Sequence, residues 1–329
     1  MFNMLTSIVF PMYNEEENVE PLFNRLLELS KSIDFDIEII AVNNGSFDQT
    51  QDKLDSIVSA SESENVPSLE CKIKVISLTR NFGYDNAILT GLEHAEGDYI
   101  AIMDGDLQDP PEEIPKFIEK IKQGYEIVYG LRNKRTENFI IRIFIRLFYF
   151  WWSKVSGYGF PKNAGNFCVI SSRVAKSINS LKETNKYFRG VRAWFGYSSL
   201  GLEYNRVHRS GGTSKFSFAS YLVYGIEGIT AFSTAPIRML TLVGIGGIAL
   251  SFIGFIIILF HKLFVVFYPN IFNTEIAAGW TSLFLLIIIL ISVNLLGLGL
   301  IGEYIARIYE ETKGRPRVVV NKISIKNKS

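Results

Sequence analysis

Short apolar runs alternate with longer amphipathic stretches along the chain as far as Gly130. Apolar runs bounded by turn residues predict buried strands, and stretches with helical spacing of apolar residues predict helices. The predicted strands are Thr6–Phe10, Ile37–Val42, Lys72–Leu78, Tyr99–Met103 and Glu126–Tyr129. The predicted helices are Glu16–Lys31, Gln49–Ser59, Tyr84–His94 and Pro111–Gln123. This alternation predicts an α/β domain with a mostly parallel sheet, which binds ligands at the carboxyl ends of its strands.

Two later stretches differ because neither contains a charged residue over the length of a membrane-spanning helix. Met239–Phe260 and Trp280–Gly302 each reach the roughly 20 apolar residues that cross a bilayer. Two buried core helices are the alternative, but two such runs in one short region exceed the core that they could share. We therefore predict a hairpin of two transmembrane helices within residues 236–303, at about 237–262 and 279–302.

Basic residues follow the second apolar stretch, whereas the loop between the two stretches offers only Lys262 beside Glu275. The positive-inside rule therefore predicts that the N-terminal domain (1–235), the basic tail (304–329) and both termini are cytoplasmic. The N-terminus enters a strand pattern without a basic region or a cleavage site, so we expect no signal peptide.

Composition narrows the class of protein further. The formal net charge of +1 argues against a nucleic-acid-binding protein, whose phosphate contacts need an excess of basic residues. Cys71 and Cys168 have neither the spacing nor the context of a disulfide or zinc site, which suits a reducing compartment.

Two further segments predict contact with the lipid surface. Residues 138–154 combine aromatic and aliphatic side chains with Arg142 and Arg146 at helical spacing, but their apolar part is too short to span a bilayer. An amphipathic helix in the membrane interface fits this pattern, and packing against the N-terminal domain is the alternative. Residues 216–233 are a second candidate, immediately before the first predicted span.

Two carboxylates one residue apart, Asp104 and Asp106, follow the predicted strand Tyr99–Met103. Alternate residues of a strand point to the same side, so both acids emerge together. Adjacent carboxylates repel each other unless a cation lies between them, and Mg²⁺ or Mn²⁺ shared with substrate phosphates suits oxygen ligands. A solvated acidic turn is the commoner explanation of an isolated Asp-x-Asp. Gln108 can add a neutral oxygen to a metal site, whereas we expect Asp109 to be the N-cap of the following helix.

Basic side chains that could meet a diphosphate occur in two places. Arg132 and Arg135 follow the last predicted strand, and Arg206, Arg209 and Lys215 flank a Gly-Gly-Thr-Ser segment. Backbone N–H groups and an ammonium group in such a loop can close over phosphates. A solvated turn is the commoner explanation of such a loop taken alone, and the position just before the apolar stretches strengthens the case for a phosphate site.

Six ordered motifs cover nearly the whole chain: SIVFPMYNEE (7–16), RNFG (80–83), DGDLQDPP (104–111), GTSKF (212–216), FSTAP (232–236) and GEYIARIY (302–309). Together they resemble the polyprenyl-phosphate glycosyltransferases of glycosyltransferase family 2, which include bactoprenol glucosyltransferases and dolichol-phosphate mannose synthase. The two apolar stretches and the Gly-Glu-Tyr ending are closer to the bactoprenol branch.

The resemblance implies a glycosyltransferase A-type, Rossmann-like catalytic domain in the bacterial inner membrane. It implies transfer, with inversion, from a nucleotide diphosphate sugar such as UDP-glucose to undecaprenyl phosphate or another polyprenyl phosphate. The lipid-linked sugar would serve the modification of a cell-surface glycan such as lipopolysaccharide. The resemblance also implies dependence on Mg²⁺ or Mn²⁺ and a homo-oligomer, for which the family suggests a tetramer.

The resemblance also implies roles for individual residues. Those that would bind the nucleotide sugar are Pro11, Tyr13, Glu15, Asn44, Asn81, Asp104, Arg135, Arg209, Ser214 and Lys215. Those that would surround the metal are Asp104, Asp106 and Gln108, and those that would act in catalysis are Asp106, Asn166 and Arg132.

Two positions depart from the family pattern. Asn44 stands where relatives usually have an Asp that accepts a hydrogen bond from the base, and an Asn can still accept through its carbonyl oxygen. Asn166 stands where relatives commonly have an Asp that is a catalytic candidate, and an amide cannot act as a general base. We expect a retained uridine donor with weaker discrimination, and a reaction that depends far more on Asp106 than on Asn166.

Three alternatives remain open from the sequence. The first is a different activated sugar, such as an amino sugar or an aminopentose, on the same lipid. The second is a membrane protein that binds a nucleotide sugar without turning it over. The third is a flippase for the lipid-linked sugar, which two spans in one chain disfavour.

Overall fold

The computed structural model describes residues 4–60, 71–132, 164–183, 187–206 and 280–327, with single positions between 242 and 264. The chain divides into two units, of which the first combines Met1–Gly228 with Gly314–Ser329 and the second is Ile229–Lys313. The predicted interfacial segments, 138–154 and 216–233, lie outside the described residues.

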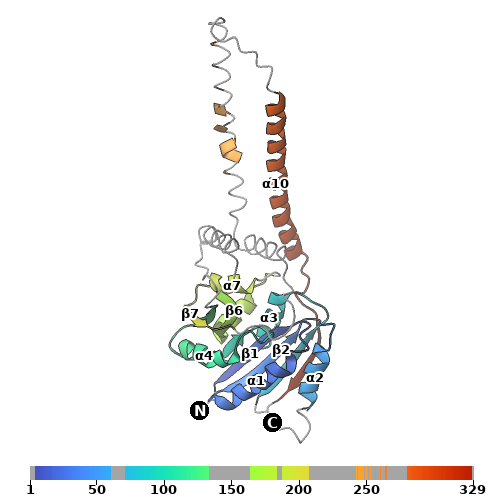
Figure 1. The fold of residues 1–329 in the computed structure, drawn as a ribbon, viewed down its shortest axis with the longest axis vertical. Coiled ribbons are helices and arrows are strands. Elements are labelled where there is room, and N and C mark those ends of the chain that lie inside the picture. Colours follow the sequence, from blue (N-terminus) through green and yellow to red (C-terminus); the bar gives the residue numbers. More distant parts are fainter. Residues whose placement is uncertain are drawn as a thin grey trace. The chain divides into compact units, whose positions relative to one another are not determined.

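An eight-stranded mixed sheet forms the centre of the first unit, in the order β7-β5-β6-β4-β1-β2-β3-β8 (Figure 1). The strands are β1 (Leu5–Met12), β2 (Asp36–Asn43), β3 (Lys72–Leu78), β4 (Tyr99–Ile102), β5 (Ile127–Arg132), β6 (Ala164–Ser171), β7 (Ser199–Tyr204) and β8 (Val320–Lys326). The first four strands run parallel, as predicted. β6 is antiparallel to β4 and β5, β7 is parallel to β5, and β8 is antiparallel to β3.

Helices pack on both faces of this sheet. They are α1 (Val19–Ser32), α2 (Thr50–Ala60), α3 (Tyr84–Glu93), a 3₁₀ turn (Pro111–Glu113), α4 (Ile114–Lys122), α6 (Ser172–Ser180) and α7 (Phe188–Trp194). On one face Phe10 of β1 contacts Phe23 of α1, with ring centroids 5.8 Å apart. On the other face α3 approaches β1 so closely that a Cβ atom at Gly91 would lie 2.2 Å from a methyl carbon of Val9. Burial on both faces explains why the part Ile8–Met12 of β1 is a continuous apolar run in the sequence.

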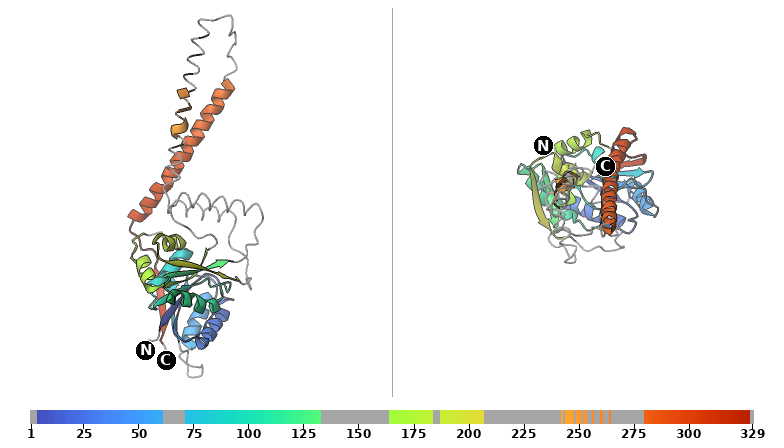
Figure 2. Two further views of the ribbon diagram at one scale, coloured as in Figure 1. Left: turned by 90° about the vertical axis from the view of Figure 1, so that its left-hand side faces the viewer. Right: turned by 90° about the horizontal axis from the view of Figure 1, so that it is seen from above.

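The C-terminal segment that the sequence presents as a basic tail contains strand β8. Between Lys322 and Lys326 its residues alternate between Lys or Ser and Ile, and the strand lies at an edge of the sheet. Ser324 pairs with Val75 in the register with β3, and the Lys322 ammonium lies 3.1 Å from a carboxylate oxygen of Asp55 on α2. Figures 1 and 2 show this strand in red among the blue elements of the N-terminal part of the chain.

The second unit contains the helix α10 (Trp280–Thr312), whose 33 residues correspond to about 50 Å. Among the described residues, its part Leu290–Thr312 is the one helix long and apolar enough to cross a membrane. Most of the first predicted span is not described, so the two-helix hairpin stays a prediction.

Candidate active site

The segments that follow the first four strands converge at one edge of the sheet, as the parallel arrangement predicts. The backbone N–H of Asn44 after β2 donates to the carbonyl of Met12 at the end of β1, at 2.9 Å. Gly105 after β4 lies so close to β1 that a Cβ atom there would be 2.7 Å from the Pro11 carbonyl oxygen. Gly45 approaches the loop after β3 in the same way, with a Cβ position 2.3 Å from the Arg80 carbonyl carbon. Small residues therefore allow the four loops to meet.

Both side-chain oxygens of Asp104 are engaged by other residues. The Tyr84 hydroxyl, at the start of α3, donates a short hydrogen bond to Oδ1. The Arg206 guanidinium, which follows β7, lies 3.1 Å from Oδ2 through Nη2. Burial, and next the charge of Asp104, raise the pKa of Tyr84 well above its usual range, so the phenol stays protonated and donates. The first acid of the pair is thus held by a donor from another loop and by a cation.

The turn that carries the acid pair has an unusual backbone. Leu107 adopts a φ of +63°, which is uncommon for a residue with a branched side chain, and its side chain is buried in the core. The backbone N–H of Gln108 donates to Asp106 Oδ1 at 3.2 Å, and that of Asp104 donates to Asp109 Oδ2 at 3.2 Å. These side-chain bonds to the backbone hold the turn in a conformation that the sequence alone disfavours.

Asp109 is not the helix cap that the sequence predicts. Pro110 occupies the N-cap position of the 3₁₀ turn, and Asp109 is fully buried. It accepts the Tyr204 hydroxyl of β7 at 2.7 Å and lies 3.7 Å from the Arg206 Nε atom. Asp109 therefore links the acid turn to the end of β7.

The site contains suitable oxygen ligands for a hard divalent cation. Asp104 and Asp106 stand at one strand end with the amide of Gln108 two residues on, as the sequence predicts. The described residues contain no group of three His, Cys, Asp or Glu side chains arranged to hold a metal ion. A donor diphosphate would supply further oxygens, which is the usual arrangement for Mg²⁺, so the donor set fits a metal held jointly with the substrate.

The oxygen and the nitrogen of the Asn44 side-chain amide both hydrogen-bond to the loop after β3. Its Oδ1 atom accepts from the backbone N–H of Phe82 at 2.9 Å, and its Nδ2 group donates to Asn81 Oδ1 and to the Gly83 carbonyl, both at 3.1 Å. Asn81 also accepts from the backbone N–H of Gly83 at 2.8 Å. Asn44, at 4% exposure, therefore fixes the shape of the loop 81–83.

The segment after β1 is bound to the loop after β2. The ring of Tyr13 contacts Phe47 edge-on at 6.3 Å, and Phe47 is 85% exposed. The Glu15 carboxylate accepts from the Asn18 side chain at 2.5 Å, while its backbone N–H donates to Thr50 at 2.9 Å. An exposed aromatic ring beside Tyr13 gives this edge a stacking surface that the sequence did not indicate.

Asn166 lies on β6, buried to 5% exposure, and its Oδ1 atom accepts from Arg189 Nε of α7 at 2.7 Å. Asn166 also acts to lower the pKa of Tyr84, against the larger effects of burial and of Asp104. Arg192 of the same helix is buried, donates to the Gly165 carbonyl at 3.2 Å and lies over the ring of Tyr129. Tyr84 and the two arginines were not among the predicted site residues.

The other predicted basic residues are only partly placed. Arg132 ends β5, where its backbone pairs with Tyr204, and its side chain is not described. Arg135, Arg209, Ser214 and Lys215 lie outside the described residues. Arg206 is the loop cation that the structure places against the acid pair.

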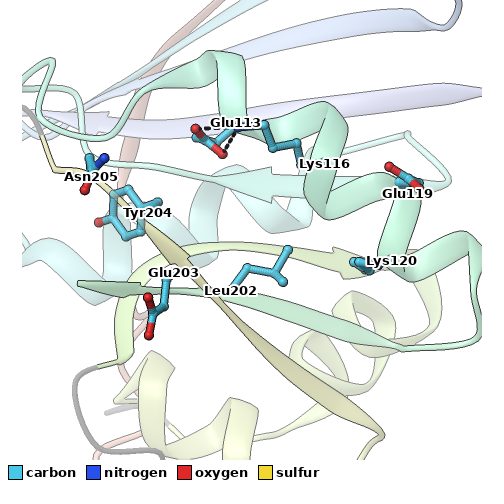
Figure 3. A pocket seen from close by; sticks show the side chains of 8 residues that line it. All are labelled: Glu113, Lys116, Glu119, Lys120, Leu202, Glu203, Tyr204 and Asn205. Carbon is cyan, nitrogen blue, oxygen red and sulfur yellow. Dashed lines mark hydrogen bonds and ion pairs between the residues drawn. The ribbon is translucent and has the colours of Figure 1, made fainter. Parts of the chain in front are cut away.

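A separate open groove lies between α4 and β7 (Figure 3). It has a volume of about 420 Å³, and its lining residues are Glu113, Lys116, Glu119, Lys120, Leu202, Glu203, Tyr204 and Asn205. The Lys116 ammonium pairs with Glu113 at 2.8 Å along the helix. The lining combines charged side chains of both signs and includes neither Asp104 nor Asp106. We therefore do not assign this groove as a sugar-donor site.

Comparisons with known proteins agree with this geometry. Residues 7–180 match the family described as glycosyl transferase family 2. An uncharacterized glycosyltransferase of Bacillus subtilis, YkcC, is 36% identical over 98% of this chain and 95% of its own. The bactoprenol glucosyl transferase derived from prophage SfII of Shigella flexneri is 34% identical over 97% of this chain and 98% of its own.

A solved structure has a similar fold. Glucosyl-3-phosphoglycerate synthase from Mycobacterium tuberculosis, in complex with Mn²⁺, UDP-glucose and phosphoglyceric acid, has a TM-score of 0.50 and 14% identity. The similarity covers 70% of this chain and 79% of that chain.

Proposed function

Because the chain belongs to glycosyl transferase family 2, we propose that it transfers a sugar from a UDP-sugar, such as UDP-glucose, to undecaprenyl or another polyprenyl phosphate. It is a glycosyltransferase with the A-type fold, similar over nearly its full length to bactoprenol glucosyl transferases. The single observation that carries the choice of acceptor is the match to a bactoprenol glucosyl transferase over 97% of this chain.

In this proposal the donor lies across the converging loops at the strand ends. Pro11, Tyr13 and Glu15 line the base and ribose, with the loop that Asn44 fixes forming the opposite wall. Asp104, Asp106 and Gln108 hold Mg²⁺ or Mn²⁺ together with the donor diphosphate. The bound cation would neutralise charge on the departing diphosphate. Arg132, Arg135, Arg209, Ser214 and Lys215 provide the remaining phosphate contacts.

The acceptor needs little acid–base chemistry. A phosphate monoester with a second pKa of about 6 is largely dianionic at neutral pH, so no proton must be removed before attack. An acceptor oxygen forms the new bond to the anomeric carbon, while the bond from that carbon to the diphosphate oxygen breaks and UDP leaves. Attack from the opposite side inverts the anomeric centre. Asn166, held by Arg189, positions the reactants without acting as a base.

The proposed acceptor and the apolar helix support a location at the membrane. A polyprenyl chain stays in the bilayer, and α10 contains one segment with the length and composition to cross it. We propose a bacterial inner-membrane enzyme with two spans, cytoplasmic termini and a cytoplasmic catalytic domain, assembled as a homo-oligomer. Its product would supply the modification of a cell-surface glycan.

The test uses purified full-length protein in detergent with undecaprenyl phosphate, Mg²⁺ or Mn²⁺ and a panel of nucleotide sugars. The lipids are extracted and analysed by mass spectrometry, with Asp106→Asn as the matched inactive control. UDP-glucose should give undecaprenyl phosphate hexose and free UDP. A product from another activated sugar would support the alternative donor, and tight donor binding without any glycolipid would support the non-catalytic protein.

A further inference from the structure

Arg206 is a cation already placed at the acid pair. Its Nη2 atom lies 3.1 Å from Asp104 Oδ2, and its Nε atom lies 3.7 Å from Asp109 Oδ1. Arg206 lies 102 positions after Asp104 and 97 positions after Asp109 in the sequence, so both contacts depend on the fold. The guanidinium thus lies between one carboxylate of the acid pair and a second, fully buried carboxylate.

Asp104 has both carboxylate oxygens engaged in this arrangement. Tyr84 donates to Oδ1 and Arg206 binds Oδ2. A divalent cation that takes an oxygen of Asp104 must therefore compete with a hydrogen bond or an ion pair. The Arg206 side chain is 28% exposed, so its ion pair is the contact that ligands in solution can reach.

Asp109 is a second carboxylate partner for Arg206. The Tyr204 hydroxyl donates to Asp109 Oδ1 at 2.7 Å, and Asp109 Oδ2 accepts the backbone N–H of Asp104, so this carboxylate is fixed from two sides. A guanidinium that leaves Asp104 can stay beside Asp109 and keep donors free for another anion. Arginine suits this exchange because its fork binds carboxylate and phosphate with similar geometry.

We propose that Arg206 is the resident counter-ion of Asp104 and that the divalent cation displaces it, after which the guanidinium binds the donor diphosphate. This inference rests on the proposed function, because it assumes a metal and a nucleotide diphosphate at this site. It assigns Arg206 two effects of opposite sign: it weakens binding of the metal alone and strengthens binding of the nucleotide.

The test measures Mn²⁺ binding to the full-length protein in nanodiscs of zwitterionic lipid, from the electron paramagnetic resonance signal of free Mn²⁺. Arg206→Gln should bind Mn²⁺ about three- to tenfold more tightly without nucleotide, because a competing charge is removed. The same variant should bind UDP in the presence of Mn²⁺ about tenfold more weakly by calorimetry, because it lacks a charged contact to phosphate.

Three further variants make the outcome specific. Arg25→Gln removes a similar exposed pair, with Glu112 at 2.6 Å on another part of the fold, and should change neither affinity. Arg206→Lys keeps the charge and should bind Mn²⁺ within about twofold of the wild type, which also covers the case that Arg206→Gln fails to fold. Asp106→Asn should lose Mn²⁺ binding and provides the baseline.

Unchanged or weaker Mn²⁺ binding in folded Arg206→Gln would overturn the inference and leave the proposed function standing. If Arg206→Gln does not fold, Arg206→Lys decides instead. A large gain in the Mn²⁺ affinity of Arg206→Lys would then overturn the inference. If the wild type binds no Mn²⁺ even with UDP-glucose, both the metal role in the proposed function and the inference are wrong.

Discussion

The side-chain oxygen of Asn44 accepts a hydrogen bond from the backbone N–H of Phe82 at 2.9 Å, while the amide group of the same side chain donates twice to that loop. An aspartate could accept the first bond but could make neither of the other two. The asparagine is therefore matched to the loop 81–83, in addition to any contact with the base.

This match predicts the result of Asn44→Asp. The carboxylate would face the Asn81 and Gly83 oxygens without a proton to donate, at a cost of about 1–3 kcal/mol in the free energy of unfolding. The melting temperature should fall by about 2–4 °C for each kcal/mol, as measured by a thermal shift of the purified protein. Asn321→Asp, at an exposed position of β8, is the control and should leave the melting temperature unchanged. A stable Asn44→Asp protein with tighter UDP binding would contradict the prediction.

A second prediction concerns the two candidate catalytic positions. Asp106→Asn should lower kcat/KM for glycolipid formation by at least about 100-fold, because it removes a proposed metal ligand at the departing diphosphate. Asn166→Ala should lower it by about tenfold or less, because it removes one neutral hydrogen-bonding side chain beside Arg189. The measurement is the initial rate of glycolipid formation at several acceptor concentrations. Full loss of turnover in Asn166→Ala with activity retained in Asp106→Asn would reverse the assignment.

The first half of the fold is predictable from the sequence because its strands are buried on both faces. Continuous apolar runs such as Ile37–Val42 then stand out between turn residues, and β2 at Asp36–Asn43 matches this prediction closely. β8 was missed because it is an edge strand whose side chains are mostly exposed. Its apolar residues alternate with Lys and Ser inside a segment whose charge dominates its composition.

The site was predictable only as far as local spacing reaches. Asp104 and Asp106 were predicted because two acids at one strand end have a local signature. The contact of Tyr84 with Asp104 depends on how α3 meets β4, and that of Arg206 depends on the register of β7 at the far side of β6. Asp109 was expected as a helix cap, since its position suits one, but the buried hydroxyl of Tyr204 binds it instead. The contacts of Asp104 and Asp109 are therefore made by residues distant in the sequence, which local spacing could not reveal.

A third prediction follows from an ion network at the opposite ends of the strands. Hydrogen bonds from Lys72 and next from Lys74, both at 2.7 Å, lower the pKa of Glu96 from 4.5 to about 2. A carboxyl whose pKa is lower in the folded state stabilises the fold above pH 4.5 and loses that contribution as the pH falls towards 2. Glu96→Gln should therefore flatten the decrease in melting temperature between these two values. Its control is Glu113→Gln in the Lys116 pair, which should keep the wild-type slope, and an identical slope in Glu96→Gln would contradict the assignment.

The last prediction concerns β8, which follows the apolar helix in sequence but belongs to the sheet of the first unit. Removing residues 320–329 should expose the backbone of β3 as an open edge with apolar neighbours, so the truncated protein should melt at a lower temperature and self-associate. The measurements are thermal unfolding and size-exclusion chromatography of the detergent-solubilised protein. Lys322→Ala is the matched control: it removes only the partly exposed pair with Asp55, which contributes about 0–1 kcal/mol, and should behave like the wild type. If the truncated protein kept the wild-type melting temperature, β8 would add nothing to the stability of the sheet, and the basic charge of this segment would be its main property.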